Sequence, residues 1–171
     1  MLAEAMDITH ILTAAVDFPL NGRHNILNAL AAAAAGYTFG MTAAEIAAAL
    51  ASAVPPPQRG EVLHFSQGFT VVNDSYNSNP AALLSMVATL LEKGGSAKRK
   101  IVVAGEMLEL GDDERSIHRQ VGEEIAGMGV DKLIGIRGLA EELVAGARDA
   151  GLADAEFAED SDAAGSLLLD Q

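Results

Sequence analysis

The chain has 171 residues, a formal net charge of −13 and no cysteine, which excludes disulfides and zinc sites built on thiolates. It shows no basic stripe of the kind that binds nucleic acid, and no apolar run reaches the roughly 18–20 residues of a membrane span. Half of its residues are hydrophobic but only 4% are aromatic. We therefore expect a soluble, cytoplasmic and monomeric protein with an aliphatic core.

The first part of the chain is rich in alanine and predicts a small helical segment. Residues 8–18 fit either a strand or a helix. Apolar residues recur at helical spacing over residues 25–35, and Gly36 is expected to end that helix. Thr42 and Glu45 have the spacing of a capping box, which predicts that a second alanine-rich helix starts there.

The run Val54–Pro57 is stiff and extended because each proline restricts the residue before it, and we expect a domain boundary there. Beyond it, short strands alternate with helices, which predicts parallel strands joined by right-handed crossovers. The predicted fold class is α/β, a Rossmann-like, mostly parallel sheet with flanking helices, preceded by the small helical segment. The predicted elements are strands 61–65 and 69–73 joined by a hairpin-like turn, helix 79–93, strand 100–104, helix 113–128, strand 132–136, helix 139–150, a weak strand around Phe157 and a last helix from about Ser161.

Two polar loops each close an apolar strand and open a helix. Asn73–Pro80 follows the apolar pair Val71–Val72, and Gly105–Gly111 follows Ile101–Ala104. Ligands of open α/β sheets bind outside the carboxyl ends of the strands. We therefore expect the two loops to lie side by side on one sheet edge and to carry the chemistry.

Three side chains outside these loops are candidates for nucleotide binding. Asn25 and Asn28 are three residues apart and share a helix face, and an Asn amide can pair with the N6/N7 edge of adenine. The alternative, favoured on these residues alone, is that Asn25 or its neighbours cap the helix. Arg59 follows the proline run, and its planar guanidinium suits a phosphate; an exposed surface arginine is the commoner alternative.

The first polar loop offers four candidates. Asp74 can accept ribose hydroxyl groups, as an acidic residue does in dinucleotide-binding folds, and Tyr76 can pack on a sugar or base. Asn77 and Asn79 can bind a polar substrate. The alternative is a turn rich in Asn and Asp that leads to a helix N-cap; it is favoured for Asn79, whose next residue is proline, and is as good for Asp74.

The second polar loop places Glu106 and Glu109 where two carboxylates can hold a cationic amine. His118 lies one turn inside the following helix, where a surface or core position is commoner than a catalytic one. The spacing of Asp74, Glu106, Glu109 and His118 matches no metal-binding motif, and we predict no metal ligand. No Gly-x-x-x-x-Gly-Lys-Ser/Thr phosphate loop is present either.

Three runs together resemble one enzyme family. Gly22–Ala32 reads Gly-Arg-His-Asn-Ile-Leu-Asn-Ala-Leu-Ala-Ala and resembles the G-x-H-N-x-x-N-x-x-A-A signature of Mur ligases. Asp74–Pro80 and Gly105–Gly111, with His118 following, resemble the D-x-Y-N-A-N-P and G-D-M-x-E-L-G…H patterns. Those two patterns mark the branch that adds D-Ala-D-Ala to UDP-MurNAc-tripeptide in peptidoglycan synthesis. Ser78 stands for the usual Ala of this branch and Glu106 for the usual Asp.

The resemblance covers roughly residues 18–136 and implies a fragment of a larger enzyme. Residues 1–56 would be the helical tail of a central ATPase domain, and residues 57–171 a carboxyl-terminal domain that lacks its last part. In the family, ATP with Mg²⁺ activates the tripeptide carboxylate as an acyl phosphate, which the amine of D-Ala-D-Ala attacks. The phosphate loop, the magnesium ligands and the modified lysine of the family are not in this chain, so we predict that the chain alone is inactive.

The resemblance also implies roles for individual residues, none of them catalytic. The implied ATP-binding residues are Asn25, Asn28, Arg59, Asp74 and Tyr76, and those on the D-Ala-D-Ala side are Asn77, Asn79, Glu106, Glu109 and His118.

Two other interpretations stay open: a related ligase, such as a folylpolyglutamate or cyanophycin synthetase, and a non-catalytic binding module derived from a ligase. A dinucleotide-binding oxidoreductase needs a glycine-rich first turn, which Asp74–Pro80 lacks.

Overall fold

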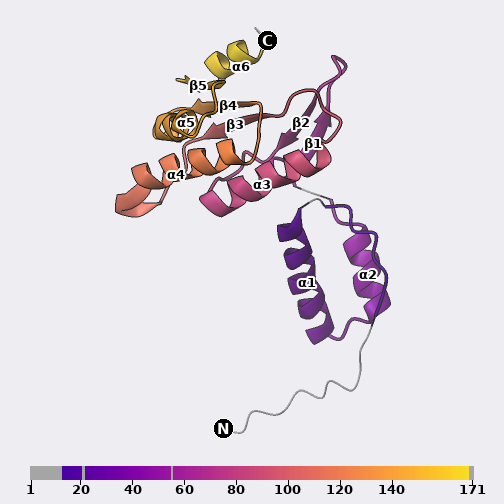
Figure 1. Ribbon diagram of the computed structural model, residues 1–171. Helices are drawn as coiled ribbons and strands as arrows, with labels where there is room; N and C mark the ends of the chain where they lie inside the picture. The colour runs from indigo at the N-terminus through magenta and orange to yellow at the C-terminus, as the bar shows by residue number, and fades with distance from the viewer. Residues whose placement is uncertain (1–12, 21, 55, 170–171) are drawn as a thin grey trace. The chain divides into compact units, whose positions relative to one another are not determined.

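The computed structural model describes residues 13–20, 22–54 and 56–169 (Figure 1). The chain divides into two compact units, Met1–Pro55 and Pro56–Gln171. Each unit is described by itself below. No helix among the described residues is both long and apolar enough to cross a membrane.

The first unit contains two helices, α1 (Arg23–Thr38) and α2 (Ala43–Ala51), as the sequence predicts. Residues 13–20 form neither helix nor strand, and the earlier part of the ambiguous run 8–18 lies outside the described residues. The capping box is confirmed. The Thr42 hydroxyl accepts the Glu45 N–H at 3.3 Å, and the Glu45 carboxylate accepts the Thr42 N–H at 2.8 Å.

The prediction that Gly36 ends the first helix is wrong, because α1 continues through it to Thr38. A side chain at Gly36 would lie 3.1 Å from Met41 Sδ and 3.2 Å from Ile46 Cγ1. The glycine therefore makes room for the chain that turns back into α2. Phe39 is the C-cap of α1, and Gly40 follows in the left-handed conformation, at φ +85°, which glycine adopts without steric penalty.

The second unit begins with an antiparallel hairpin of β1 (Glu61–His64) and β2 (Thr70–Asn73). The predicted hairpin turn is confirmed: the Phe65 N–H donates to the Phe69 carbonyl at 3.0 Å, and the two rings stack at 4.5 Å. Among the described residues, β2 pairs with no strand other than β1.

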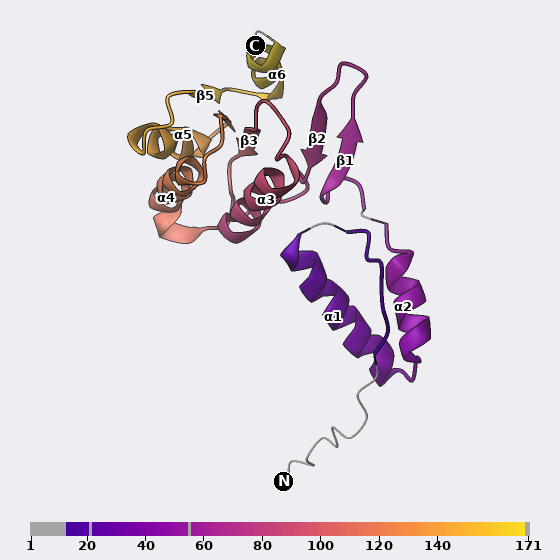
Figure 2. The same ribbon diagram turned by 45° about the vertical axis from the view of Figure 1, so that its right-hand side comes forward.

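The hairpin is a two-stranded sheet of its own, which Figure 2 shows beside the larger sheet. The expectation that the two polar loops share one sheet edge is therefore wrong, since β2 and β3 belong to different sheets. The connection from β2 to β3 runs through α3, yet among the described residues β2 pairs with β1 alone.

The second sheet contains three parallel strands in the order β3-β4-β5, which confirms the α/β class and the parallel strands predicted from the sequence. Helices α3, α4 and α5 cover one face of this sheet and α6 covers the other (Figures 1 and 2). The elements are α3 (Pro80–Lys93), β3 (Ile101–Gly105), a 3-10 turn η1 (Gly111–Asp113), α4 (Glu114–Gly127), β4 (Lys132–Ile136), α5 (Ala140–Asp149), β5 (Ala155–Ala158) and α6 (Ser161–Leu169).

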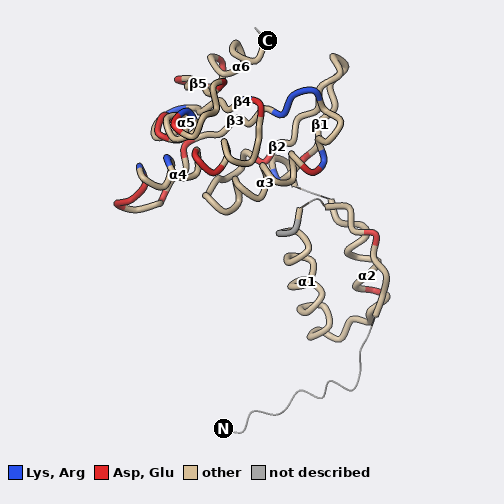
Figure 3. The backbone as a smooth tube through the Cα atoms, in the orientation of Figure 1, with Lys and Arg blue, Asp and Glu red and all other residues tan. Residues whose placement is uncertain are grey.

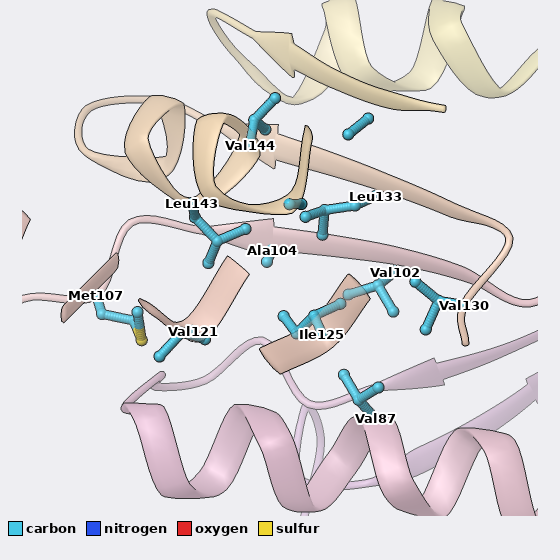
Figure 4. Packing of buried hydrophobic residues seen from close by; sticks show 12 residues of the cluster. Val87, Val102, Ala104, Met107, Val121, Ile125, Val130, Leu133, Leu143 and Val144 are labelled. Carbon is cyan, nitrogen blue, oxygen red and sulfur yellow. The ribbon is translucent and has the colours of Figure 1, made fainter. Parts of the chain in front are cut away.

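The core lies mainly on the face covered by α3, α4 and α5 (Figure 4). Successive residues of a strand point to opposite faces, and β4 follows this rule. Leu133 packs with Ile125 and Leu143 in the main cluster, whereas Ile134 packs with α6 in a smaller cluster on the other face. Leu133 and Ile134 are both completely buried.

Helices α4 and α5 approach each other closely through two glycines. A Cβ built on Gly122 would collide with the backbone carbonyl of Leu143, and one built on Gly146 would collide with that of Arg119. Around this contact Arg119 forms ion pairs with Glu142 and Asp149. The two helices are therefore fixed against each other by backbone contact as well as by charge.

Lys132 begins β4 and is 1% exposed. Its ammonium forms ion pairs with Asp154, at 2.9 Å, and with Glu156. Burial by itself lowers the pKa of Lys132, but the hydrogen bonds to Glu156 and Asp154 outweigh it and raise the pKa above its ordinary value of 10.5. This buried cation ties the start of β4 to the neighbouring strand β5.

Candidate functional site

The hairpin brings Arg59 and Tyr76 together at its open end. The guanidinium carbon of Arg59 lies 4.3 Å from the centre of the Tyr76 ring, a cation–π contact. Pro56, Pro57 and Gln58 complete an open hollow around these two side chains. Tyr76 is 65% exposed and Arg59 is also exposed, so an aromatic side chain and a positive charge both face solvent.

The geometry of this hollow follows from the backbone on both sides of the hairpin. Gln58 adopts a left-handed conformation, φ +61°, and its carbonyl accepts the Tyr76 N–H at 3.3 Å. Asp74 follows the end of β2, is half-buried, and has no ion pair to any described residue. The sequence prediction that Arg59, Asp74 and Tyr76 belong to one site fits this arrangement, although their ligand contacts stay a prediction.

The turn from β2 into α3 is shaped by three asparagines. Asn79 is the N-cap of α3, and its side chain accepts the Ala82 N–H at 2.9 Å. Asn77 accepts the N–H of Ser78 at 2.9 Å. Asn73, which the sequence did not single out, accepts the N–H of Ser75 at 3.3 Å and its hydroxyl at 2.8 Å. These contacts favour the turn-and-cap interpretation for Asn79.

After β3, the side chain of Glu106 reaches the start of α5. Its Oε1 accepts the Leu139 N–H at 2.9 Å, next to the N-terminus of a helix, where negative charge is favourable. A Cβ built on Gly138 would collide with the Glu106 carboxylate. The glycine at this position is therefore what allows Glu106 to reach the helix.

His118 of α4 is completely buried. Its Nε2 accepts the backbone N–H of Met107 at 2.9 Å, and its Nδ1 lies 2.7 Å from the Glu114 carbonyl. Because Nε2 is an acceptor, the proton is on Nδ1, which donates to that carbonyl. The core alternative considered for His118 is thus the position that it occupies, and its implied role on the D-Ala-D-Ala side stays a prediction.

Glu109 and Leu108 are the exposed residues of the same loop. Glu109 adopts φ +62°, a left-handed conformation that costs a non-glycine residue about 1–3 kcal/mol. It makes no ion pair or side-chain hydrogen bond with any described residue. A strained, exposed carboxylate is the group of this loop that is best placed to meet a ligand.

In the first unit, Asn25 and Asn28 share a helix face as predicted, since Asn28 Nδ2 donates to Asn25 Oδ1 at 3.3 Å. The N-cap of α1 is Gly22, without a side-chain cap. Asn25 therefore lies inside the helix rather than capping it, and the amide pair remains a candidate for ligand binding.

Among the predicted site residues, Arg59 contacts Tyr76 and Asn28 contacts Asn25. Glu106 and His118 instead accept backbone N–H groups of the protein. Met107 and Leu139 were missed, because only their backbone N–H groups take part and no side-chain pattern reports those. Within 13–20, 22–54 and 56–169, no group of three or more His, Cys, Asp or Glu residues is placed to hold a metal ion.

A parallel sheet with polar loops after its strands, preceded by a hairpin with an arginine at its base, is an α/β domain of the class whose ligands bind outside the carboxyl ends of the strands. A family model described as "Mur ligase, glutamate ligase domain" matches residues 58–171. The chain therefore belongs to the Mur ligase family.

The relatives and solved structures that match the chain are longer proteins. It is 37% identical over 126 residues to the UDP-N-acetylmuramoyl-tripeptide–D-alanyl-D-alanine ligase of Escherichia coli (strain K12), covering 72% of this chain and 27% of that protein. For the ligase of the same name from Bacillus subtilis (strain 168), the identity is 34% over 115 residues, with 67% and 25% covered. The chain thus spans about a quarter of the length of these relatives.

Two solved ligases share the fold. A crystal structure of MurF from Acinetobacter baumannii matches with a TM-score of 0.78 and 25% identity, covering 90% of this chain and 32% of that one. MurF ligase from Thermotoga maritima, solved in complex with ADP, matches with a TM-score of 0.70 and 22% identity, covering 89% and 33%. The second likeness concerns the fold alone.

Proposed function

We propose that this chain is part of an ATP-dependent ligase that adds D-Ala-D-Ala to UDP-MurNAc-tripeptide in peptidoglycan synthesis. The observation that carries the proposal is the Arg59–Tyr76 contact beside Asp74, in a chain whose 34–37% identical relatives are named as this ligase. Residues 1–56 contribute the tail of the central ATPase domain, and residues 57–171 most of the carboxyl-terminal domain.

On the nucleotide side, each proposed contact matches a chemical group of ATP. The Arg59 guanidinium meets the phosphates, because a planar cation pairs well with phosphate oxygens. Asp74 accepts the ribose hydroxyls, and Tyr76 offers a flat surface to the sugar or base. Asn25 and Asn28 pair with the adenine edge.

On the acceptor side, the amine of D-Ala-D-Ala has to reach an acyl phosphate that is shielded from water. Glu109 offers an exposed carboxylate for the ammonium of the dipeptide, and Asn77 offers an amide. Holding the amine in place turns a bimolecular attack into an effectively unimolecular one. The described part of this chain contributes binding and orientation to the reaction, and no proton transfer is assigned to it.

Activation of the tripeptide carboxylate takes place outside this chain, because no phosphate loop is present in its sequence. The resemblance implies Mg²⁺ as a cofactor of the complete ligase, and we propose no magnesium ligand in this chain. We therefore expect the purified chain to release no ADP when it is given ATP, Mg²⁺, UDP-MurNAc-tripeptide and D-Ala-D-Ala. Because ATP is an intracellular metabolite, we propose that the ligase acts in the cytoplasm. We also propose that it acts as a monomer.

The proposal is tested with Asp74→Ala in the complete ligase. We expect the KM for ATP to rise about tenfold, because a charge-assisted hydrogen bond to the ribose is lost, while the KM for D-Ala-D-Ala stays within about twofold. Glu92→Ala is the control, since Glu92 is an exposed carboxylate of α3. An unchanged KM for ATP removes Asp74 from the nucleotide site, and absence of ligation by the wild-type ligase overturns the function.

A further inference from the structure

We propose that His118 and Glu106 are positioning residues that hold the loop 106–110, here called the β3 loop, so that it presents Glu109 to the substrate amine. The inference rests on the proposed function for the identity of that amine, the D-Ala-D-Ala ammonium. It separates three residues that the sequence pattern treats alike.

The first anchor is the hydrogen bond from the Met107 N–H to His118 Nε2, at 2.9 Å. The imidazole is completely buried, and its other nitrogen is engaged with the Glu114 carbonyl inside α4. With both ring nitrogens in use, His118 has no free polar atom for a ligand. It therefore acts on the β3 loop through the backbone of Met107.

The second anchor is the hydrogen bond from the Leu139 N–H to Glu106 Oε1. The Glu106 carboxylate lies against Gly138, where a Cβ would collide with it. It accepts the N–H of Leu139, the N-cap residue of α5. Glu106 is thus directed across to the next strand–helix connection of the sheet. This contact joins the β3 loop to the segment between β4 and α5.

A third contact fixes the start of the β3 loop. The side chain of Met107 is 1% exposed and belongs to the main hydrophobic cluster, as Figure 4 shows. Leu108 and Glu109 follow directly and are exposed. A loop that is pinned at 106 and 107 and left-handed at 109 has little freedom, so the direction of Glu109 is set by residues that never meet the substrate.

The test compares His118→Gln with His118→Leu. The Gln oxygen can accept the Met107 N–H, whereas Leu fills the space without an acceptor. In the 171-residue chain, we expect hydrogen exchange of the Met107 amide to become at least about tenfold faster with Leu and to stay near the wild-type rate with Gln. Exchange of the Leu133 amide, which donates to the Asp154 carbonyl in the core, reports whether each variant is folded.

In the complete ligase, we expect His118→Leu to raise the KM for D-Ala-D-Ala about tenfold, with the KM for ATP changed by less than about twofold. With His118→Gln, the KM for D-Ala-D-Ala should stay near the wild-type value. Glu109→Gln should raise the same KM without changing Met107 exchange. Leu108→Ala, an exposed neighbour, is the control that leaves both unchanged.

Three results overturn the proposal: equal loss with Gln and Leu in folded protein, unchanged Met107 exchange with Leu, or a wild-type dipeptide KM with Glu109→Gln. If the wild-type ligase does not join D-Ala-D-Ala at all, the proposed function fails, and Met107 exchange in the 171-residue chain still decides whether His118 anchors the loop.

Discussion

The helices of the first unit and those of the second differ in what they bury. No described residue between 13 and 54 is fully buried, whereas α4 buries His118, Val121, Gly122 and Ile125. On α1, Leu27 and Leu30 are 67% and 62% exposed. Similar apolar side chains therefore stabilise one unit and are left in solvent in the other.

Charge follows the same division. Figure 3 shows few charged residues along α1 and α2 and many along the second unit, where the ion pairs among the described residues lie. A helix with a large exposed apolar surface and few charges normally packs on another surface. The first unit thus has the character of part of a larger domain, in keeping with its proposed place in a central ATPase domain.

The largest effect is expected from separating the units between Pro55 and Pro56. Residues 56–171 should unfold cooperatively with the melting temperature seen for this unit in the whole chain, because they keep their core. Residues 1–55 should show no cooperative transition, since no described residue of this unit is fully buried and most helical stability in proteins comes from tertiary packing. Circular dichroism of both fragments checks this, and a cooperative transition of residues 1–55 alone would break the comparison.

A matched pair of leucines tests burial directly. Leu133→Ala in β4 should destabilise the second unit by about 2–5 kcal/mol, because it opens a cavity in a completely buried site. Leu27→Ala in α1 should change the free energy of unfolding by less than about 0.5 kcal/mol. Urea denaturation of the 171-residue chain measures both, and similar effects of the two changes would mean that Leu27 is covered in solution.

A matched pair of glycines tests the rigidity of the packing. Gly122→Ala should destabilise by about 1–3 kcal/mol, because the added methyl meets the Leu143 backbone and forces α4 and α5 apart. Gly36→Ala should be neutral or stabilising, since its neighbours are side-chain atoms of Met41 and Ile46, which can move, and Ala is the better helix former. Thermal melts compare the two variants, and tolerance of Gly122→Ala would show that the α4–α5 contact is looser.

Changes of pH should affect the stability of the two units with opposite signs. The raised pKa of Lys132 means that its ion pairs stabilise fully below pH 10.5, and that this stability is lost as pH rises through the folded-state pKa. Backbone and side-chain hydrogen bonds from Thr42 lower the pKa of Glu45 below 4.5, so the capping box stabilises above pH 4.5 and is lost as pH falls through the lower folded-state value.

Two variants separate these pH effects. Lys132→Met should lower the free energy of unfolding by about 1–3 kcal/mol at pH 7. The loss is modest because the side chains of Asp154 and Glu156 are 40% and 39% exposed, so solvent screens their charges. The same variant should flatten the decline in stability above pH 10.5. Glu45→Gln should remove the acid-dependent loss of helix in α2, because the Gln amide does not titrate and can still accept the Thr42 N–H. Unfolding curves and helix content measured across pH check both, and an unchanged alkaline slope in Lys132→Met would contradict the first.

The sequence by itself determined the local elements of this protein. The N-cap at Asn79, the capping box at Thr42 and the strand at residues 132–136 were predicted because caps and periodicity depend on neighbours a few residues apart. The resemblance to Mur ligases also implied one ATP site for Arg59 and Tyr76; the two side chains are in contact, and the ATP site stays a prediction.

Only the tertiary structure decided which strands share a sheet and what the loop side chains contact. In the folded chain, β2 pairs with β1 in the hairpin, and α1 continues beyond Gly36. Glu106 accepts a backbone N–H 33 residues away, and His118 accepts one 11 residues away. These contacts depend on packing between distant segments and use backbone groups that every residue has. No residue pattern in a single sequence records them, so a carboxylate that caps a helix and one that faces a ligand look the same until the chain is folded.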